Sequence, residues 1–304
     1  MRLSEVNDEA IDGSGGRAAG AGAVSSNNGS GLMRSNRVLV ALFVLGVSCL
    51  APRAGAGAPA AGKSGDEPWK PLFNGRDLTG WYTLVGDKKD DDPQKIVQVH
   101  DGMIHMYEDT TAGTPAPFGY VATDREFESY DLRFEYRWGE KKFGNRVRAP
   151  RDAGLIYHFV GKDKIWPRGI ECQVQEQDTG DIFTVLTRVS STVAPRTQTY
   201  QSPEEGGVPI TVGSGRTIAR IRRSKMLEVA GWNKVEVRVR RGGATHVVNG
   251  QVNNRWTNLL QPDTANPGRY IPLTRGKILL QAEGAEISYR KIEVRELPPG
   301  ATQP

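Results

Sequence analysis

The 304-residue sequence predicts an all-β fold, an antiparallel sandwich of short strands. Short segments in which apolar and polar residues alternate recur along the chain, as expected for strands with one buried face. Asp101-Gly102 and Asn249-Gly250 each join two such segments, and these dipeptides are typical of tight hairpin turns. No segment carries the apolar stripe of an amphipathic helix, so the alternation of strands and helices that builds parallel sheets is not expected.

The N-terminal part of the chain is not expected to join this fold. Residues 1–32 are a low-complexity extension, and residues 57–68 are an Ala/Gly/Pro linker before a folded domain at residues 69–298. Between them, residues 33–56 combine a basic flank, an apolar run too short to span a bilayer and a small-residue cleavage site. We therefore expect a secretory signal peptide, export to the periplasm or cell surface, and no membrane span in the mature chain. The alternative is an uncleaved N-terminal anchor.

Composition narrows the possible partners. Cleavage of the signal would leave Cys172 as the sole cysteine, so no internal disulfide is expected, and its place among apolar strand residues indicates a buried side chain. The net charge is +5, and basic residues are interspersed with acidic ones along the strands. The densest basic clusters lack the interleaved aromatic residues on which bases stack, so nucleic acid is not an expected partner.

The strand predictions follow the chain in order. A hairpin comprises residues 96–100 and 103–107, and residues 118–123 form a short strand. Residues 130–138 alternate cleanly, and residues 182–189 follow as a further strand. Residues 232–240 alternate again, residues 245–248 run into a second hairpin turn at Asn249-Gly250, and residues 277–281 and 287–294 close the domain. We expect irregular structure at residues 141–151, 192–215 and 258–270.

One stretch, residues 152–181, carries the candidate site. In its second strand, Ile170, Cys172 and Val174 alternate with polar residues, so Glu171, Gln173 and Gln175 are expected on one sheet face. In its first strand, His158 falls in the phase opposite to the apolar set Leu155, Tyr157 and Phe159. If these strands are neighbours, the imidazole, the carboxylate and two amides share one face. Such groups suit acid–base work on a polyol.

Several segments together resemble one family. LFNGRDLTGW, SYDLRFEYRW, DAGLIYHF, WPRGIECQVQE, AGWNKVEVRVRRGGATHVVNG and GKILLQAEGAEISYRKIEVREL are similar to the 3-keto-disaccharide hydrolase family, long known as domain of unknown function 1080. The resemblance covers roughly residues 69–297. It implies a concanavalin-like jelly-roll β-sandwich, export, and action on carbohydrates oxidised at C3. This chain has Ala282-Glu283-Gly284 where family members often have a His-Gly pair, and His158 where others often have Arg.

The implied chemistry assigns roles to the candidate residues. A ketone at C3 makes the C2 proton acidic, so a base can remove it and the C1 substituent can leave by β-elimination before water adds. His158 is the expected base because imidazole titrates near neutral pH, the alternative being a structural histidine. Glu171 is the second candidate, as a base or metal ligand, or else as an ion-paired surface carboxylate. Gln173 and Gln175 suit sugar hydroxyls, unless they form a merely polar exterior.

Further candidates are weaker. Asp152 and Asp181 could join Glu171 around a hard divalent cation, Ca²⁺ or Mg²⁺. Trp166 could stack on a sugar ring or belong to the core, and Arg290 could be aimed at a substrate oxygen by a bulge or be a surface cation. The remaining substrate-binding candidates share a strand phase or lie beside the second hairpin: Gln281, Glu283, His246 and Asn249.

Three functions remain open at this stage. The first is an exported enzyme that cleaves 3-keto glycosides, and the second is a non-catalytic carbohydrate-binding jelly-roll module, since sandwich folds host both. The third is a structural surface domain without a ligand. A shielded acid–base group in the site would favour the enzyme, whereas a flat face with exposed aromatic rings would favour binding.

Overall fold

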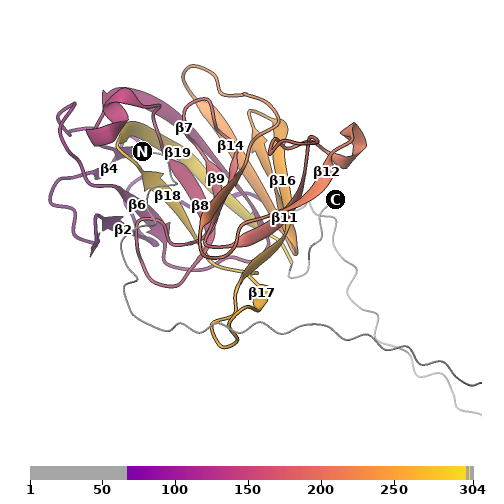
Figure 1. Cartoon of the computed structure of the whole chain (residues 1–304). Coiled ribbons are helices and arrows are strands. Elements are labelled where there is room, and N and C mark those ends of the chain that lie inside the picture. Colours follow the sequence, from indigo (N-terminus) through magenta and orange to yellow (C-terminus); the bar gives the residue numbers. More distant parts are fainter. Residues whose placement is uncertain (1–66, 299–300, 302–304) are drawn as a thin grey trace, which may run out of the picture. The chain divides into compact units, whose positions relative to one another are not determined.

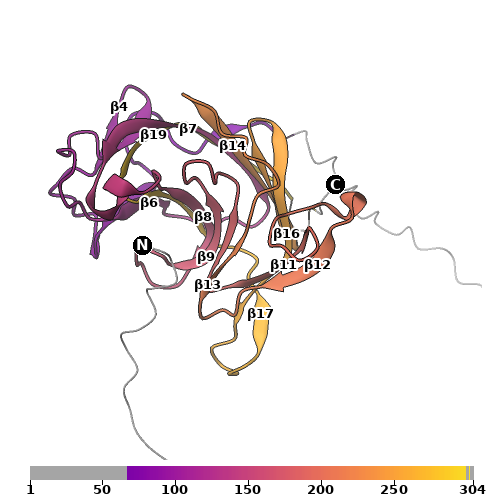
Figure 2. The same cartoon turned by 45° about the horizontal axis from the view of Figure 1, so that its top comes forward.

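The computed structural model describes residues 67–298 and residue 301, which form an antiparallel sandwich of two sheets. The expected extension and signal peptide, and the linker up to residue 66, lie outside the described residues. Figure 1 shows the two layers, and in Figure 2 strands β6, β8 and β9 lie inside the arc of β19, β7 and β14. The predicted all-β jelly-roll sandwich is confirmed. Within residues 67–298, no helix is long and apolar enough to cross a membrane.

One sheet, here called the large sheet, has eleven strands. Its main path runs β12-β11-β16-β15-β14-β7-β19-β5-β4, with β1 paired to β19 and β17 paired to β16. The bounds are β1 Lys70–Pro71, β4 Val97–His100, β5 Met103–Met106, β7 Tyr130–Lys142, β11 Arg188–Val193, β12 Val208–Val212, β14 Asn233–Arg240, β15 Gly243–Val248, β16 Gln251–Pro262, β17 Tyr270–Pro272 and β19 Ala285–Glu296.

The other sheet, here called the small sheet, has eight strands in the order β13-β10-β9-β8-β18-β6-β2-β3. The bounds are β2 Trp81–Val85, β3 Lys88–Lys89, β6 Gly119–Thr123, β8 Gly154–Val160, β9 Arg168–Gln173, β10 Ile182–Val185, β13 Ile218–Ile221 and β18 Lys277–Ala282. Two short 3-10 helices, η2 at Gly144–Arg148 and η3 at Pro203–Glu205, lie in the connections.

Alternating side chains divide the small sheet into an inner and an outer face. On β8, Leu155 and Tyr157 join the core between the sheets, whereas Ile156 joins a separate apolar cluster with Leu279 and Tyr120. Successive side chains on a strand point to opposite faces, so this second cluster lies on the outer face of the small sheet. Cys172 is buried in the core between the sheets, as its sequence position predicts.

Both hairpin predictions are confirmed. Asp101 and Gly102 have φ values of 50° and 74°, and Asn249 and Gly250 have φ values of 48° and 82°, as a two-residue type I′ turn requires. His100 pairs with Met103 across the first turn.

Three expectations about irregular or continuous segments are wrong. The segment 182–189 is divided: Leu186 has a φ of 54°, and the chain passes there from β10 in the small sheet to β11 in the large one. The segment 192–215 contains β12, which pairs with β11, and the segment 258–270 contains the end of β16. These strands lack clean alternation, and their pairing with distant strands is a tertiary effect that local pattern does not contain.

Candidate active site

The outer face of the small sheet gathers the acidic residues of the candidate site. Ile170 and Cys172 point into the core, so Glu171 between them points outward, and Gln281 does the same between Leu280 and Ala282. These two side chains meet above Gly154 of β8. A methyl group placed on Gly154 would lie 2.2 Å from Glu171 Oε1 and 1.9 Å from Gln281 Oε1. Glycine at this position therefore makes room for both functional groups.

Glu283 and Asp152 complete the acidic group beside Gln281. Glu283 Oε1 accepts hydrogen bonds from Trp166 Nε1 at 2.6 Å and from Gln281 Nε2 at 2.8 Å. Arg146, on helix η2, forms an ion pair with Asp152, and the same Nη2 atom lies 3.6 Å from Glu283 Oε2. The site thus has three buried carboxyl groups and one guanidinium. We call Asp152, Glu171 and Glu283, with Arg146, the carboxyl cluster.

Burial governs the acid–base behaviour of the carboxyl cluster. It raises the pKa of Glu171 well above the usual value, and the neighbouring Glu283 and Asp152 raise it further, while Arg146 opposes the rise. Burial also raises the pKa of Asp152 and of Glu283, again against the influence of Arg146. A single cation cannot balance three carboxylates in a desolvated site, so the ionisation of all three together is opposed.

Glu171 differs from the other two acids in its partners. Asp152 and Glu283 share Arg146, whereas no hydrogen bond or ion pair joins the Glu171 carboxyl to any residue of segment 67–298. In the same place, Gln281 Oε1 is buried without a hydrogen-bond partner among these residues. Buried polar atoms normally have partners, so the free carboxyl and amide oxygens mark a position where a polar ligand can bind.

A second polar group continues along the same face. Tyr82 and Tyr120 belong to the outer apolar cluster, and their hydroxyls donate to Asp163 Oδ1 at 2.5 and 3.1 Å. Trp166 packs against this cluster, with its ring edge toward Phe118 at a centroid distance of 6.0 Å. Aromatic faces next to amides and carboxylates are groups that can contact a sugar ring and its hydroxyls.

The prediction that His158 shares a face with Glu171 is wrong. The register of β8 against β9 shifts between Tyr157 and Val160, and His158 has a φ of 50°. This bulge turns the imidazole toward the core, where its ring lies 6.0 Å from those of Tyr130 and Tyr157, and Phe159 takes the outer face instead. Burial lowers the pKa of His158 to about 4, against the opposing effect of backbone groups of Leu273 and Glu128.

Three other candidates, His246, Asn249 and Arg290, lie away from the carboxyl cluster. His246 is buried between the sheets, 2.7 Å from the Tyr157 hydroxyl, and Asn249 holds its turn by accepting from Lys234 N at 2.8 Å. Arg290 lies on the large sheet, paired with Glu135 at 2.8 Å. Gln175 lies beyond the end of β9 and opposite Asp152, since Val174 N donates to Ala153 O at 3.0 Å and Glu176 N to Arg151 O at 2.9 Å. The structure therefore does not bring His246, Asn249 and Arg290 together with the carboxyl cluster, because their strands belong to the other sheet. Their contact with substrate stays a prediction.

Most of the remaining candidates lie together at the carboxyl cluster. The structure brings Trp166, Gln281, Glu283 and Glu171 together, and Gln281 and Glu283 lie side by side as their shared strand phase predicts. Gln173 shares their face, but its Oε1 accepts from Val174 N at 2.9 Å and so caps its own strand.

The predicted hard-cation set of Asp152, Asp181 and Glu171 is not assembled. Asp181 pairs with Arg220 and Arg223 at the turn before β10, and Asp152 pairs with Arg146. In the described part of the chain, the one group of three side chains able to hold a metal ion is His100, His105 and Glu108, on the large sheet.

Arg146 is the functional candidate that the sequence analysis missed. It lies in the segment 141–151, which the sequence predicts only as a basic loop. Asp152 follows Arg146 closely in the chain, whereas Glu283 is distant, and the contact with Glu283 depends on helix η2 folding over the turn at Gly284. A methyl group added to Gly284 would lie 3.1 Å from Arg146 Cγ. The one available signal was the density of basic residues directly before the candidate strands.

Comparison with solved structures finds distant likenesses. Solved structures that resemble this chain include a candidate glycosyl hydrolase from Parabacteroides distasonis, with 18% identity, a TM-score of 0.46, and coverage of 75% of this chain and 94% of that one. A carbohydrate-binding module from Bacillus subtilis has 9% identity, a TM-score of 0.38, and coverage of 73% and 98%. Likenesses this distant say nothing about function.

Sequence comparison is more specific. No curated protein sequence matches this chain. The family described as the 3-keto-alpha-glucoside-1,2-lyase-like domain matches residues 68–295, a range that includes both sheets and every member of the carboxyl cluster. This agrees with the resemblance drawn from the sequence segments above, and the chain therefore belongs to the family of 3-keto-alpha-glucoside-1,2-lyase-like domains.

Proposed function

We propose that this chain cleaves the glycosidic bond of 3-keto glycosides by β-elimination, with Glu171 as the base. The observation that carries the proposal is the Glu171 carboxyl, which is buried beside two other acids and has no partner among residues 67–298. A raised pKa brings a carboxylate closer to the operating pH and makes it a stronger base once ionised. With His158 turned into the core, Glu171 is the remaining base candidate of the original pair.

The proposed steps assign one role to each part of the carboxyl cluster. Glu171 takes the C2 proton, the C2–H electron pair forms the C1–C2 double bond, and the C1–O bond breaks. The Arg146 guanidinium, held next to the acids, stabilises the enolate charge that develops on the C3 oxygen. Asp152 and Glu283 share that one cation, so one of the two holds a proton that it can give to the leaving oxygen. Water then adds across the double bond, which completes hydrolysis.

The other residues of the face would position the sugar. The free Gln281 Oε1 can accept from a ring hydroxyl, and the Trp166 ring can lie against the sugar. The Tyr82–Tyr120–Asp163 group extends the same face and can contact the second sugar unit. The segment expected to be a signal peptide adds the proposal that the enzyme acts outside the cytoplasm.

A non-catalytic carbohydrate-binding module is the second candidate. The aromatic groups of the outer cluster favour it, since rings beside polar groups are all that binding requires. Three acids around one cation favour an enzyme over a binding module, because sugar binding gains little from carboxyl groups whose ionisation is suppressed.

The experiment compares purified protein on a 3-keto-disaccharide and on its unoxidised parent, each with and without EDTA. We expect cleavage of the keto sugar alone, and a reaction in D₂O that places deuterium at C2 of the product. A control with product and no enzyme measures spontaneous exchange at C2. Cleavage of both sugars without deuterium would indicate an ordinary glycosidase, and binding without cleavage would indicate the module.

A further inference from the structure

A second group of titratable side chains lies on the large sheet, away from the carboxyl cluster. It consists of His100 at the end of β4, His105 in β5 and Glu108 just after β5. One ligand atom of each residue lies within 4.8 Å of those of the other two. Ile104 and Met106 point into the core, so His105 between them points to the outer face of the large sheet.

The hairpin itself brings these residues together. His100 pairs with Met103, and His105 pairs with Gln98, so the two histidines are diagonal neighbours on one face. Their rings are stacked, with centroids 4.1 Å apart and planes 10° apart. Because the Asp101-Gly102 turn fixes this register, the two imidazoles are held close before any ligand arrives.

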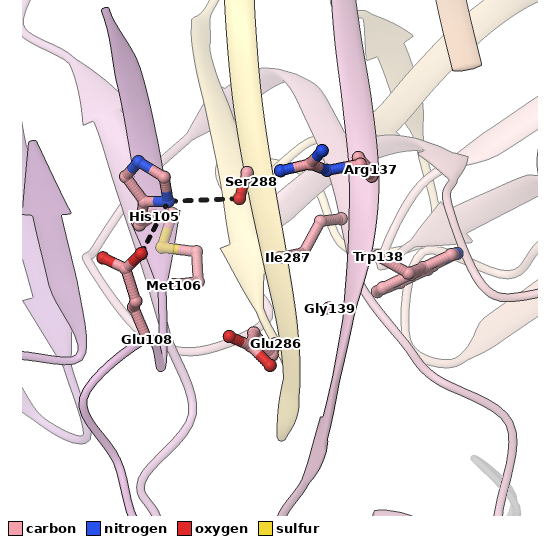
Figure 3. Close-up of a pocket in the computed structure, with 9 residues that line it drawn as sticks. All are labelled: His105, Met106, Glu108, Arg137, Trp138, Gly139, Glu286, Ile287 and Ser288. Atoms are coloured by element: carbon pink, nitrogen blue, oxygen red, sulfur yellow. Dashed lines mark hydrogen bonds and ion pairs between the residues drawn. The ribbon is translucent and has the colours of Figure 1, made fainter. Parts of the chain in front are cut away.

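The third member connects both imidazoles. Glu108 Oε2 lies 2.5 Å from His100 Nε2, and Glu108 Oε1 lies 3.6 Å from His105 Nδ1. Ser288 Oγ lies 3.1 Å from the same His105 Nδ1. Figure 3 shows His105 between Glu108 and Ser288, at the rim of a pocket that Arg137 and Glu286 also line.

One atom of the group has no partner. His105 is 6% exposed, and its Nε2 makes no hydrogen bond within the described residues. A buried imidazole nitrogen without a partner is a polar group that calls for a ligand. His105 Nδ1 faces Glu108 and Ser288, so an ion held together with Glu108 would bind His105 through Nδ1. The other ring nitrogen of a ligating histidine commonly bonds a carboxylate, carbonyl or water, and Nε2 is open to such a partner here.

We propose that His100, His105 and Glu108 bind a divalent transition-metal ion of the zinc class. Imidazole nitrogens suit Zn²⁺, Cu²⁺ and Ni²⁺, whereas Ca²⁺ and Mg²⁺ prefer oxygen ligands. Two histidines and one glutamate supply three ligands, which leaves a fourth position for water. Since β4 is the last strand on its side of the large sheet, the metal would tie the edge hairpin together.

The test is calorimetric titration of the full chain, freed of any affinity tag, with ZnCl₂ and separately with CaCl₂. We expect one Zn²⁺ per chain and no comparable Ca²⁺ binding. His100→Ala and Glu108→Gln should each weaken Zn²⁺ binding at least about tenfold. The matched control is Asp109→Asn: Asp109 is exposed, its Oδ2 accepts from Gln98 Nε2 at 2.8 Å, and it is not a member of the group, so binding should stay within about twofold.

Two further measurements keep the outcome unambiguous. Co²⁺ should give visible absorption bands in the wild type that His100→Ala lacks, and thermal melting shows that each variant is folded; the His100 side chain is 42% exposed, so its removal should spare the core. Unchanged Zn²⁺ binding in both ligand variants, or equally tight Ca²⁺ binding, would overturn the proposal. Glu171→Gln should bind Zn²⁺ normally, which separates this site from the carboxyl cluster.

Discussion

The outer faces of the two sheets look alike in sequence and differ in how their acids are paired. On β7, Glu135 alternates with core residues as Glu171 does on β9. Glu135 is half-buried and bonds Arg290 at 2.8 Å and Lys291 at 3.0 Å. Partial burial opposes its ionisation, but these bonds hold the pKa of Glu135 below its usual value. Glu171 is buried, has no such bond, and its pKa is raised.

The contrast shows that alternation alone does not identify a site. Two strands can present the same polar pattern, yet one face is a set of matched ion pairs and the other has more acids than cations. Exposed pairs contribute little and can be replaced, whereas a buried unmatched acid is costly to stability and is retained where chemistry needs it. The following predictions set the two faces against each other.

The largest expected difference is in activity. Glu171→Gln keeps the shape of the side chain but removes the base, and we expect a loss of roughly 10²–10⁴ in kcat/KM on a 3-keto-disaccharide. Glu135→Gln, the matched change on the large sheet, should alter kcat/KM by less than about twofold. Equal losses in the two variants, or none in either, would remove the carboxyl cluster from the mechanism.

Two glycines offer the next comparison. A methyl group on Gly154 would lie 1.9 Å from Gln281 Oε1, and one on Gly139 of β7 would lie 2.3 Å from the Glu286 side chain. The Glu286 side chain is 20% exposed, so it can move into solvent at the cost of its hydrogen bonds from Glu140 N and Lys141 N, whereas Gln281 is enclosed. Gly154→Ala should therefore cost about 1–3 kcal/mol of unfolding free energy and most of the activity, and Gly139→Ala clearly less. Urea unfolding measures both, and equal costs would mean that the cluster is not tightly packed.

Much of the fold was predictable because its information is local. The hairpins at Asp101-Gly102 and Asn249-Gly250 follow from turn chemistry, and the facing of Glu171 follows from strand period. The position of His158 was not predictable, because one bulged residue moves its side chain to the opposite face of the sheet. The alternation of apolar and polar residues in the sequence does not reveal the bulge. The approach of Arg146 to Glu283 was also out of reach, because it joins segments whose contact depends on the completed sandwich.

The pH dependence of stability gives a smaller effect with a definite sign. The pKa values of Asp152, Glu171 and Glu283 are raised on folding, so the stability that they contribute is fully present below about pH 4 and is lost as the pH rises through the folded values. Glu171→Gln should therefore melt above the wild type, and the gap should widen with rising pH.

The expected size of that gap is modest. A gain of about 1 kcal/mol would raise the Tm of a domain of this size by roughly 2–4 °C. Subtracting the wild-type curve removes the opposite contribution of His158 and His246, whose lowered pKa values of about 4 make stability fall as the pH drops from about 6.5 toward 4. A gap that closes with rising pH would mean that Glu171 is stabilised as a carboxylate.

The smallest expected effect is at His158, and it tests the finding that this side chain lies on the core face of β8, opposite to Glu171. Asparagine tolerates a φ of 50°, so the bulge should survive in His158→Asn. The smaller core side chain should lower the free energy of unfolding by about 1 kcal/mol. Because the imidazole contacts Tyr130 and Tyr157 on the core side of β8, kcat/KM should stay within about threefold of the wild type. A hundredfold loss in a folded variant would mean that the strand rearranges on binding substrate and brings His158 to the outer face. In that case the imidazole, and not Glu171, would be the base.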